Sequence, residues 1–274
     1  MKKLFKRFLI YFTAFAGIFV FMVAPRTASK PDMSAFTGAF AHRGYFDNEN
    51  GIPENSLAAF QKAVDAGVGI ELDVRLSSDG VAMVFHDKTL ERMCGVEGSV
   101  WDYTSQELQQ MTLLDTEYTI PTLQQAIELI AGQVPVIVEH KMDLVDTAIC
   151  QSSYNVMKNY QGNWCMKSFD PRALIWYKSN APEVIRGQLS AQFWEDEQYS
   201  GKPLYVAMGY MVANVLSRPD FISYYYEHKD NISLKICRFL GAQTACWTIQ
   251  SQMDFDSLKD EFDIVLFDSF ELSI

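Results

Sequence analysis

Carboxylates at alternate positions of two apolar segments give the first indication of chemistry. Glu71 and Asp73 alternate with apolar residues in GIELDV, and Glu139 has the same setting in VIVEHK. Side chains two positions apart on a strand share one face. Like charges held together disfavour ionisation unless a cation compensates them, and oxygen ligands suit Mg²⁺ or Ca²⁺. We therefore expect one divalent cation at these three residues. The simpler alternative is a solvated strand face or a set of structural ion pairs.

Two histidines stand at the ends of short apolar runs. His42 lies in AHRG and His86 in VFHD. An unperturbed imidazole titrates near neutral pH and therefore suits proton transfer. We expect His42 and His86 to be a catalytic pair, one activating a nucleophile and the other protonating a leaving alcohol. His140 and His228 are expected to be structural.

Two cations accompany these residues. Arg43 and Lys141 suit a phosphoryl group; they could also neutralise Glu54 or Glu139, and the two roles are compatible. Trp247 ends the strand-like run TACW and either walls a substrate pocket or lies in the core. The combination predicts metal-assisted hydrolysis of a phosphodiester.

Strand-like and helical segments alternate from residue 36 onward. Expected strands are Ala39–His42, Gly69–Arg75, Ala82–His86, Pro135–Lys141, Trp164–Phe169, Val184–Leu189, Asp220–Tyr226, Thr244–Thr248 and Ile264–Asp268. The Gly-containing turn SSDG suggests that Ala82–His86 forms a hairpin with Gly69–Arg75. The other strands are eight in number and of parallel type. Expected helices are Ser56–Ala66, Leu123–Ala131, Leu144–Tyr160, Pro171–Lys178, Ile232–Leu240 and Gln252–Glu261, with an extra helix over Leu204–Leu216. This alternation predicts an α/β fold, a TIM (β/α)8 barrel.

Local signals refine two helix starts and the position of the site. Asn55 is expected to cap the helix that opens at Ser56, and Thr104 with Glu107 fits a capping box. Catalytic residues of such barrels lie at the carboxyl ends of strands. His42, Asp73 and Lys141 all fall at such ends.

The N-terminus has the plan of a membrane anchor. Basic residues 1–7 precede an apolar run from Phe8 to Ala24, the short limit for a transmembrane helix. We expect residues 1–25 to be an anchor, or an uncleaved signal, followed by a polar linker over 26–35 and a barrel domain over 36–274. The alternative is a signal peptide with a weak cleavage site at Thr27-Ala28-Ser29. The basic end predicts a single-pass protein of the cell membrane with its catalytic domain outside the cytoplasm.

Charge and cysteine content exclude other classes. The net charge is −11 although the first seven residues are basic, so we expect no nucleic-acid partner. The five cysteines show no CxxC pair and no Cys/His spacing typical of zinc. They are expected to be buried free thiols.

An ordered series of motifs resembles the glycerophosphodiester phosphodiesterase family. The motifs run from about Ala39 to Asp268 and read AHRG, PENS, ELDV, SSDG, VFHD, IPTL, VEHK, KSFD, CWTI and LFD. The resemblance implies a TIM-barrel enzyme that hydrolyses glycerophosphodiesters to sn-glycerol 3-phosphate and an alcohol. It implies one Ca²⁺ or Mg²⁺ at Glu71, Asp73 and Glu139, acid–base catalysis by His42 and His86, phosphate binding by Arg43 and Lys141, and a supporting role for Glu54.

Departures from the family pattern concern the substrate. Met93-Cys94 stands where two threonines are common, and Phe267 stands where a threonine is common. Two alternatives of the same family are a lysophospholipase D and a hydrolase of glycerophosphate polymers. A non-catalytic lipid- or glycerophosphate-binding barrel is a third, but such a protein is expected to lack a histidine or a metal carboxylate that this sequence retains.

Overall fold

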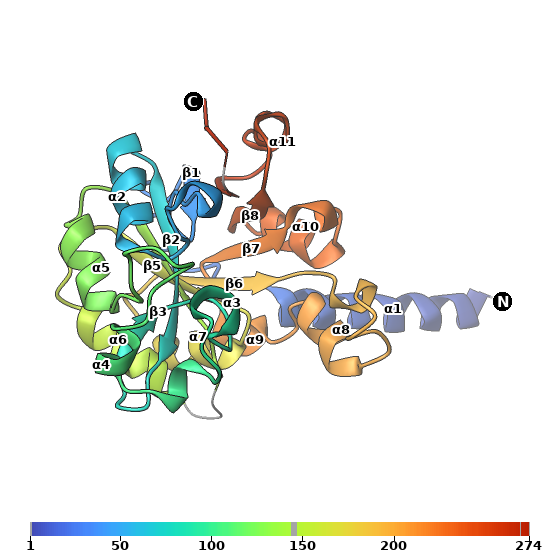
Figure 1. Cartoon of the computed structure of the whole chain (residues 1–274). Helices are drawn as coiled ribbons and strands as arrows, with labels where there is room; N and C mark the ends of the chain where they lie inside the picture. The colour runs from blue at the N-terminus through green and yellow to red at the C-terminus, as the bar shows by residue number, and fades with distance from the viewer. Residues whose placement is uncertain (1, 144–146, 269, 274) are drawn as a thin grey trace.

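Eight parallel strands close into a barrel surrounded by helices (Figure 1). The computed structural model describes residues 2–143, 147–268 and 270–273. The barrel strands are β1 (Gly38–His42), β2 (Gly69–Leu76), β4 (Val136–His140), β5 (Trp164–Ser168), β6 (Arg186–Ser190), β7 (Phe221–Tyr225), β8 (Gln243–Ile249) and β9 (Ile264–Phe267). β1 pairs with both β9 and β2, which closes the sheet. The short strand β3 (Ala82–Val84) is antiparallel to β2. The predicted barrel and its hairpin are confirmed.

Helices cover the outside of the barrel. They are α2 (Leu57–Ala66), α3 (Glu91–Cys94), α4 (Ser105–Leu108), α5 (Leu123–Ile130), α6 (Ala148–Met157), α7 (Pro171–Asn180), α8 (Pro203–Gly209), α9 (Asn214–Ser217), α10 (Ile232–Phe239) and α11 (Gln252–Leu258), and α1 (Lys2–Val23) precedes the barrel. All six expected barrel helices are present, although Leu144–Asp146 of one prediction lie outside the described residues. The single helix expected over Leu204–Leu216 is instead two short helices, α8 and α9.

Alternation along the strands separates two apolar layers. Ile70, Leu72 and Val74 of β2 face the surrounding helices, as predicted. The opposite faces of several strands fill the amino-terminal half of the barrel interior with a second cluster. Met33 and Phe36 join this cluster from the segment before β1 and close the barrel from below. Burial of each such side chain stabilises the fold by roughly 1.5–3 kcal/mol.

Two glycines make room for aromatic rings inside the barrel. A Cβ on Gly69 would lie 2.4 Å from the ring of Phe40, and one on Gly187 would lie 2.1 Å from the ring of Phe221. Side chains cannot approach this closely. Glycine is therefore required at both positions if the phenylalanines are to fill the interior.

The start of α2 differs from the prediction. Ser56, not Asn55, is the N-cap, and its Oγ accepts from the backbone N–H of Ala59. Asn55 has a positive φ of 56° and turns its side chain into the barrel, where it binds Asp73. Both residue types cap helices well, and the buried carboxylate decides between them. The capping box of Thr104 and Glu107 is confirmed.

His140 faces the outer apolar layer, as expected for a structural histidine. It is buried, and Tyr177 Oη lies 3.1 Å from its Nε2. Burial lowers the pKa of His140 from 6.5 to about 4. The native protein therefore holds this ring neutral between these two pH values, whereas the unfolded chain protonates it.

This difference predicts an acid-side loss of stability. Stability from neutral His140 is full above about pH 6.5 and falls as pH drops toward 4, by about 3 kcal/mol in total. Urea unfolding of the wild type and of His140→Phe between pH 4 and 7 measures it. We expect a shallower pH dependence in the variant, and identical slopes would contradict this origin.

α1 is long and apolar enough to cross a membrane, and no other helix in the described ranges passes that test. The polar linker predicted after it is held against the amino-terminal end of the barrel. Arg26 pairs with Asp220 at 3.2 Å, and Lys30 donates to the carbonyl of Leu240 at 2.9 Å. The segment therefore fixes the base of α1 to the barrel.

Candidate functional site

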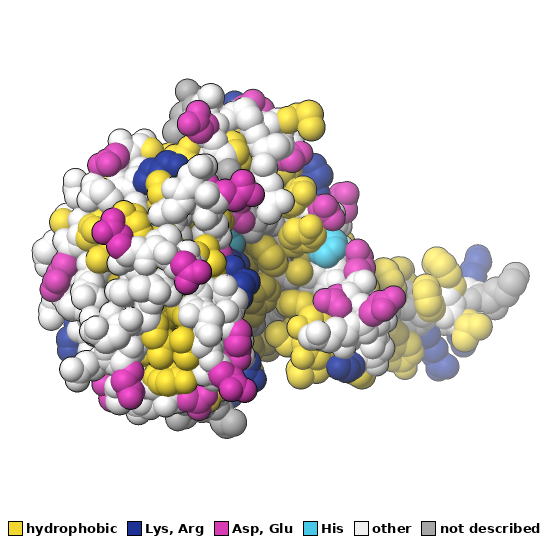
Figure 2. Space-filling model, viewed as in Figure 1, with side chains coloured by type: hydrophobic (Ala, Val, Ile, Leu, Met, Phe, Trp, Pro, Cys, Tyr) yellow, Lys and Arg dark blue, Asp and Glu magenta, His cyan; other side chains and the backbone are white. Residues whose placement is uncertain are grey.

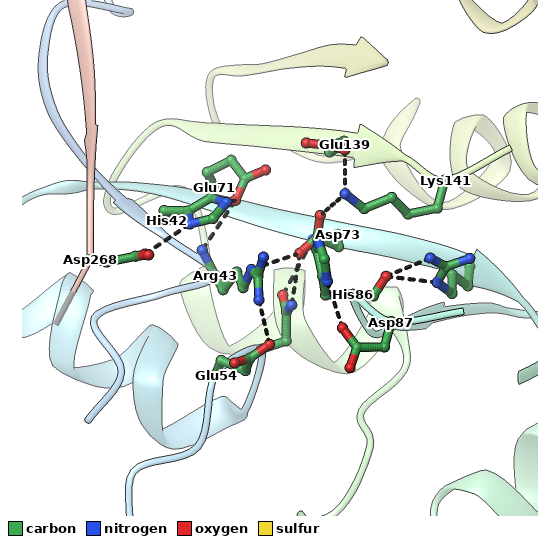
Figure 3. Close-up of polar contacts among 12 residues, drawn as sticks. His42, Arg43, Glu54, Glu71, Asp73, His86, Asp87, Glu139, Lys141 and Asp268 are labelled. Carbon is green, nitrogen blue, oxygen red and sulfur yellow. Dashed lines mark hydrogen bonds and ion pairs between the residues drawn. The ribbon is translucent and has the colours of Figure 1, made fainter. Parts of the chain in front are cut away.

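The predicted carboxylates and histidines meet at the carboxyl-terminal half of the barrel interior (Figure 3). The strand register places His42 beside Glu71 and Asp73 beside Glu139. Lys141 directly follows β4, and His86 follows the hairpin strand β3. Parallel strands bring their carboxyl ends to one rim, which explains how residues so far apart in sequence form one cluster.

Three buried carboxylates form the centre of the site. One oxygen from each of Glu71, Asp73 and Glu139 lies within 4.8 Å of the others. Glu71 Oε1 and Asp73 Oδ1 are buried, and each faces a lysine ammonium group. Oxygen donors arranged in this way fit a hard divalent cation.

Two lysines pair with these carboxylates. Lys141 Nζ lies 2.9 Å from Asp73 Oδ1 and also contacts Glu139. Lys167 Nζ lies 3.1 Å from Glu71 Oε1 and 3.3 Å from Glu139 Oε2. The lysines therefore compensate part of the charge for which a cation was expected, and the ion pairs considered as the alternative are present. Sequence reasoning missed Lys167, although a lysine two residues after the inward-facing Cys165 was an available signal.

The lysines determine the ionisation of the carboxylates. Burial alone raises the pKa of Glu139, but Lys141 and Lys167 together bring it down to about 2. Burial also raises the pKa of Asp73, but several neighbouring cations outweigh it and hold that pKa well below its usual range. Lys141 makes the largest contribution among them. Both groups are therefore ionised at neutral pH and available as ligands.

Each catalytic candidate histidine is bound to an aspartate. Nδ1 of His42 donates to Asp268 at 2.8 Å, and Nδ1 of His86 donates to Asp87 at 2.7 Å. These bonds place the remaining lone pair or proton on Nε2 of each ring. Nε2 of His42 lies 3.9 Å from Glu71. Sequence reasoning did not identify Asp268 as a partner of His42, since the two residues lie near opposite ends of the barrel domain in sequence.

The surroundings of His42 act on its pKa in opposite directions. Burial lowers the pKa, but Glu71 and then Asp268 raise it above the ordinary value of 6.5. Asp268→Asn is therefore expected to lower the pKa of His42 and to widen the pH range in which the ring is neutral. NMR titration of the imidazole protons measures this. Asp87→Asn is the matched control and should leave His42 unchanged; an unaltered pKa in Asp268→Asn would contradict the assignment.

Arg43 connects the carboxylate cluster to the loop before α2. Its guanidinium donates to Glu54 at 2.7 Å and lies 3.7 Å from Asp73, while its backbone N–H donates to Glu71. Arg92 also binds Glu54 through two hydrogen bonds. Glu54 therefore pairs with two arginines, and the pairing of Arg43 with Glu54 that the sequence suggested is present.

The backbone at this corner is constrained. Arg43 has a φ of 59°, a left-handed conformation that non-glycine residues rarely adopt. The following Gly44 has no room for a side chain, because a Cβ there would lie 2.8 Å from that of Ala59. Such outliers persist where surrounding contacts fix them. Here they orient the Arg43 N–H toward Glu71.

Trp247 lies on the rim with other aromatic residues and, within the described ranges, does not contact the carboxylates. Its ring packs edge-on against Phe169 at 5.6 Å and lies 5.4 Å from that of Tyr225. Its Nε1 is buried and has no hydrogen-bond partner in the described part of the chain. Of the predicted site residues, Trp247 is the one that stands apart from the polar cluster.

Comparison with known proteins agrees with this geometry. A model of the glycerophosphoryl diester phosphodiesterase family matches residues 42–268. A Bacillus altitudinis protein named glycerophosphodiester phosphodiesterase is 42% identical over 101 residues, which cover 34% of this chain and only 40% of that relative. Glycerophosphodiester phosphodiesterase 1 of Mus musculus is 27% identical over 78% of this chain and 72% of its own length.

The fold also matches a solved structure. A phosphodiesterase of Oleispira antarctica, in complex with the product sn-glycerol-3-phosphate, superposes with a TM-score of 0.69 at 24% identity, covering 85% of this chain and 93% of its own. This match supports the barrel. The family model spans both histidines, all three carboxylates and the closing Asp268, and the chain belongs to the glycerophosphoryl diester phosphodiesterase family.

Proposed function

We propose that this protein hydrolyses glycerophosphodiesters to sn-glycerol 3-phosphate and an alcohol. The observation that carries the proposal is the placement of two histidine–aspartate pairs around three buried carboxylates. The names of the relatives point to the same activity, as does the product bound to the solved neighbour.

Glu71, Asp73 and Glu139 would hold one divalent cation, Ca²⁺ or Mg²⁺. Their oxygens are close together and buried, which fits such an ion. When bound, the cation supplies neutralising charge and polarises a phosphoryl oxygen. Lys141, already beside Asp73, would turn its ammonium toward the phosphoryl group, and Arg43 would bind another of its oxygens.

His42 and His86 would move the protons. Asp268 and Asp87 hold their Nδ1–H groups, so Nε2 of one ring accepts the proton of the nucleophile. Nε2 of the other ring donates to the oxygen of the leaving alcohol. Glu54 would keep Arg43 in position, and Trp247 would form the wall beside the alcohol.

One observation supports an apolar alcohol as the leaving group of this reaction. The rim carries the aromatic side chains of Phe169, Tyr225 and Trp247, which suit an alcohol with a hydrocarbon part, as in a lysophospholipase D. Nothing similar favours a glycerophosphate polymer. A binding protein without catalysis is disfavoured because both His–Asp pairs are intact.

The domain assignment follows the same proposal. Residues 1–25 would anchor the protein in the cell membrane, 26–35 would connect the anchor, and 36–274 would form the catalytic domain. Lys2, Lys3, Lys6 and Arg7 at the start of α1 favour a cytoplasmic N-terminus and an outward-facing barrel. A reporter fused after Ile274 that remained in the cytoplasm would contradict this orientation.

Metal removal tests the proposed reaction. The full chain in detergent should hydrolyse glycerophosphocholine or lysophosphatidylcholine, lose activity with a chelator, and regain it with Ca²⁺ or Mg²⁺, because the carboxylates need the ion to bind a phosphate of like charge. Release of sn-glycerol 3-phosphate is measured. The Glu71→Ala variant, which is expected to be inactive, is the control for contaminating enzymes. Activity that survives complete chelation would contradict the metal assignment.

A further inference from the structure

We propose that residues 203–217, between β6 and β7, form a membrane-docking surface that lies in the outer interface of a lipid bilayer beside α1. The inference rests on the membrane crossing proposed for α1. The partner is the bilayer itself. Figure 2 shows hydrophobic side chains along α1 and on the lobe next to it.

The segment has the composition of an interfacial element. Residues 203–217 contain no charged side chain, and Lys202 and Arg218 flank them. Leu204 and Leu216 are 66% and 59% exposed. Apolar side chains exposed between flanking cations are typical of segments that lie in a membrane interface.

A groove joins this segment to α1. It has a volume of about 620 Å³ and is lined mainly by apolar side chains, among them Met22, Leu204, Met208, Val212, Val215 and Leu216. Asp170 and Arg172 also line it and are paired with each other at 2.6 Å. Because Met22 belongs to α1, the groove and the membrane-crossing helix form one continuous apolar surface.

The length of α1 decides where this surface lies. The apolar run from Phe8 to Ala24 extends about 25 Å at 1.5 Å per residue, and the hydrocarbon core is about 30 Å thick. The helix can therefore cross only if its last turns are also inside the bilayer. Those turns are the ones that contact the β6–β7 segment.

Specific contacts fix the segment to these last turns. The ring of Phe19 packs edge-on against Tyr210 at 6.0 Å, and Tyr210 stacks on Trp194 at 4.9 Å. Phe19 lies five residues before Ala24, or about 7 Å deeper along the helix. Asn214 and Arg218 donate to carbonyls at the end of α1. Tyrosine and tryptophan are enriched in segments that meet a membrane interface.

The docking surface also leads to the active site. In Figure 1, β6 points toward the side from which α1 projects, and the segment follows its carboxyl end. Phe193 of this connection packs against Phe169, which packs against Trp247 on the rim. The barrel mouth would thus open close to the lipid surface. Since the chain as a whole is acidic, docking depends on apolar burial and not on anionic lipid.

Spin labels on the full chain in phosphatidylcholine vesicles test this surface. Cys94, the half-buried cysteine, is first replaced in Cys94→Ser; the other four are buried. Single labels are then attached in Leu204→Cys, Phe12→Cys on α1 and Met253→Cys on α11, at side chains 66%, 59% and 77% exposed. For each label, collision with oxygen is compared with collision with a water-soluble nickel chelate, because oxygen concentrates in the bilayer.

The expected result is a severalfold higher oxygen-to-nickel ratio at 204 than at 253, approaching the ratio at 12. A water-exposed label at 204 with a lipid-exposed label at 12 overturns the docking surface and leaves the crossing intact. Water exposure at both positions overturns the crossing and the docking surface together. Hydrolysis of glycerophosphocholine by the same preparations reports the catalytic proposal separately.

Discussion

Replacing either His42 or His86 by alanine is expected to lower kcat by about 10²- to 10⁴-fold, the usual contribution of one general acid or base. Each ring offers its Nε2 because an aspartate binds Nδ1, at 2.8 Å for His42 and 2.7 Å for His86. Steady-state release of sn-glycerol 3-phosphate, with metal present, measures the effect. The melting temperature should change little, since neither ring belongs to the apolar core.

His228→Gln is the matched control for these variants. His228 is also partly buried, with its Nδ1 bound to the backbone of Gln192 and its Nε2 near Glu195. It makes no contact with the carboxylate cluster in the described residues, so kcat should remain within twofold or so of the wild type. A full loss of activity in His228→Gln, or normal turnover in His42→Ala, would contradict the assignment of roles.

Lys167→Met is expected to cost about 3–5 kcal/mol of unfolding free energy when no metal is present, because removing one partner leaves buried charges uncompensated. Lys167 is 1% exposed and lies between Glu71 and Glu139. Methionine fills a similar volume but carries no charge. Urea unfolding in the presence of a chelator measures the loss.

Lys235→Met provides the matched comparison. Lys235 pairs with Asp230 at 2.7 Å, but both side chains are exposed, so the change should remain within about 0.5 kcal/mol. Added Ca²⁺ or Mg²⁺ should restore part of the stability of Lys167→Met, because a bound cation replaces the missing charge. Equal losses in the two variants would show that the buried lysine does not hold the carboxylates together.

The sequence predicted the parts of the site that follow strand periodicity. Glu71 and Asp73 could be assigned to one inner face because their neighbours Ile70 and Leu72 are apolar, and the structure has this arrangement. Eight strands of parallel type led directly to the barrel. Both inferences use local pattern, which a single sequence displays.

Partners from distant strands could not be predicted in this way. Asp268 binds His42 only because β9 pairs with β1, and no local pattern records that pairing. Asn55 has the residue type of a helix cap, but its amide is used by the buried Asp73. The polar linker also packs on the barrel, since Arg26 finds the carboxylate of Asp220. In each case the contact is made with a residue that is distant in sequence, and local sequence patterns do not reveal such contacts.

The pairing of β1 with β9 has a consequence for biosynthesis. β1 emerges early, yet one of its two edges stays open until the last strand of the barrel has been made. Contacts of such high sequence separation form late, and an open strand edge is prone to wrong pairing. The bond from His42 to Asp268 crosses this seam. On the proposed mechanism, a chain truncated before β9 would carry nearly every site residue but would lack Asp268, the partner that holds Nδ1 of His42.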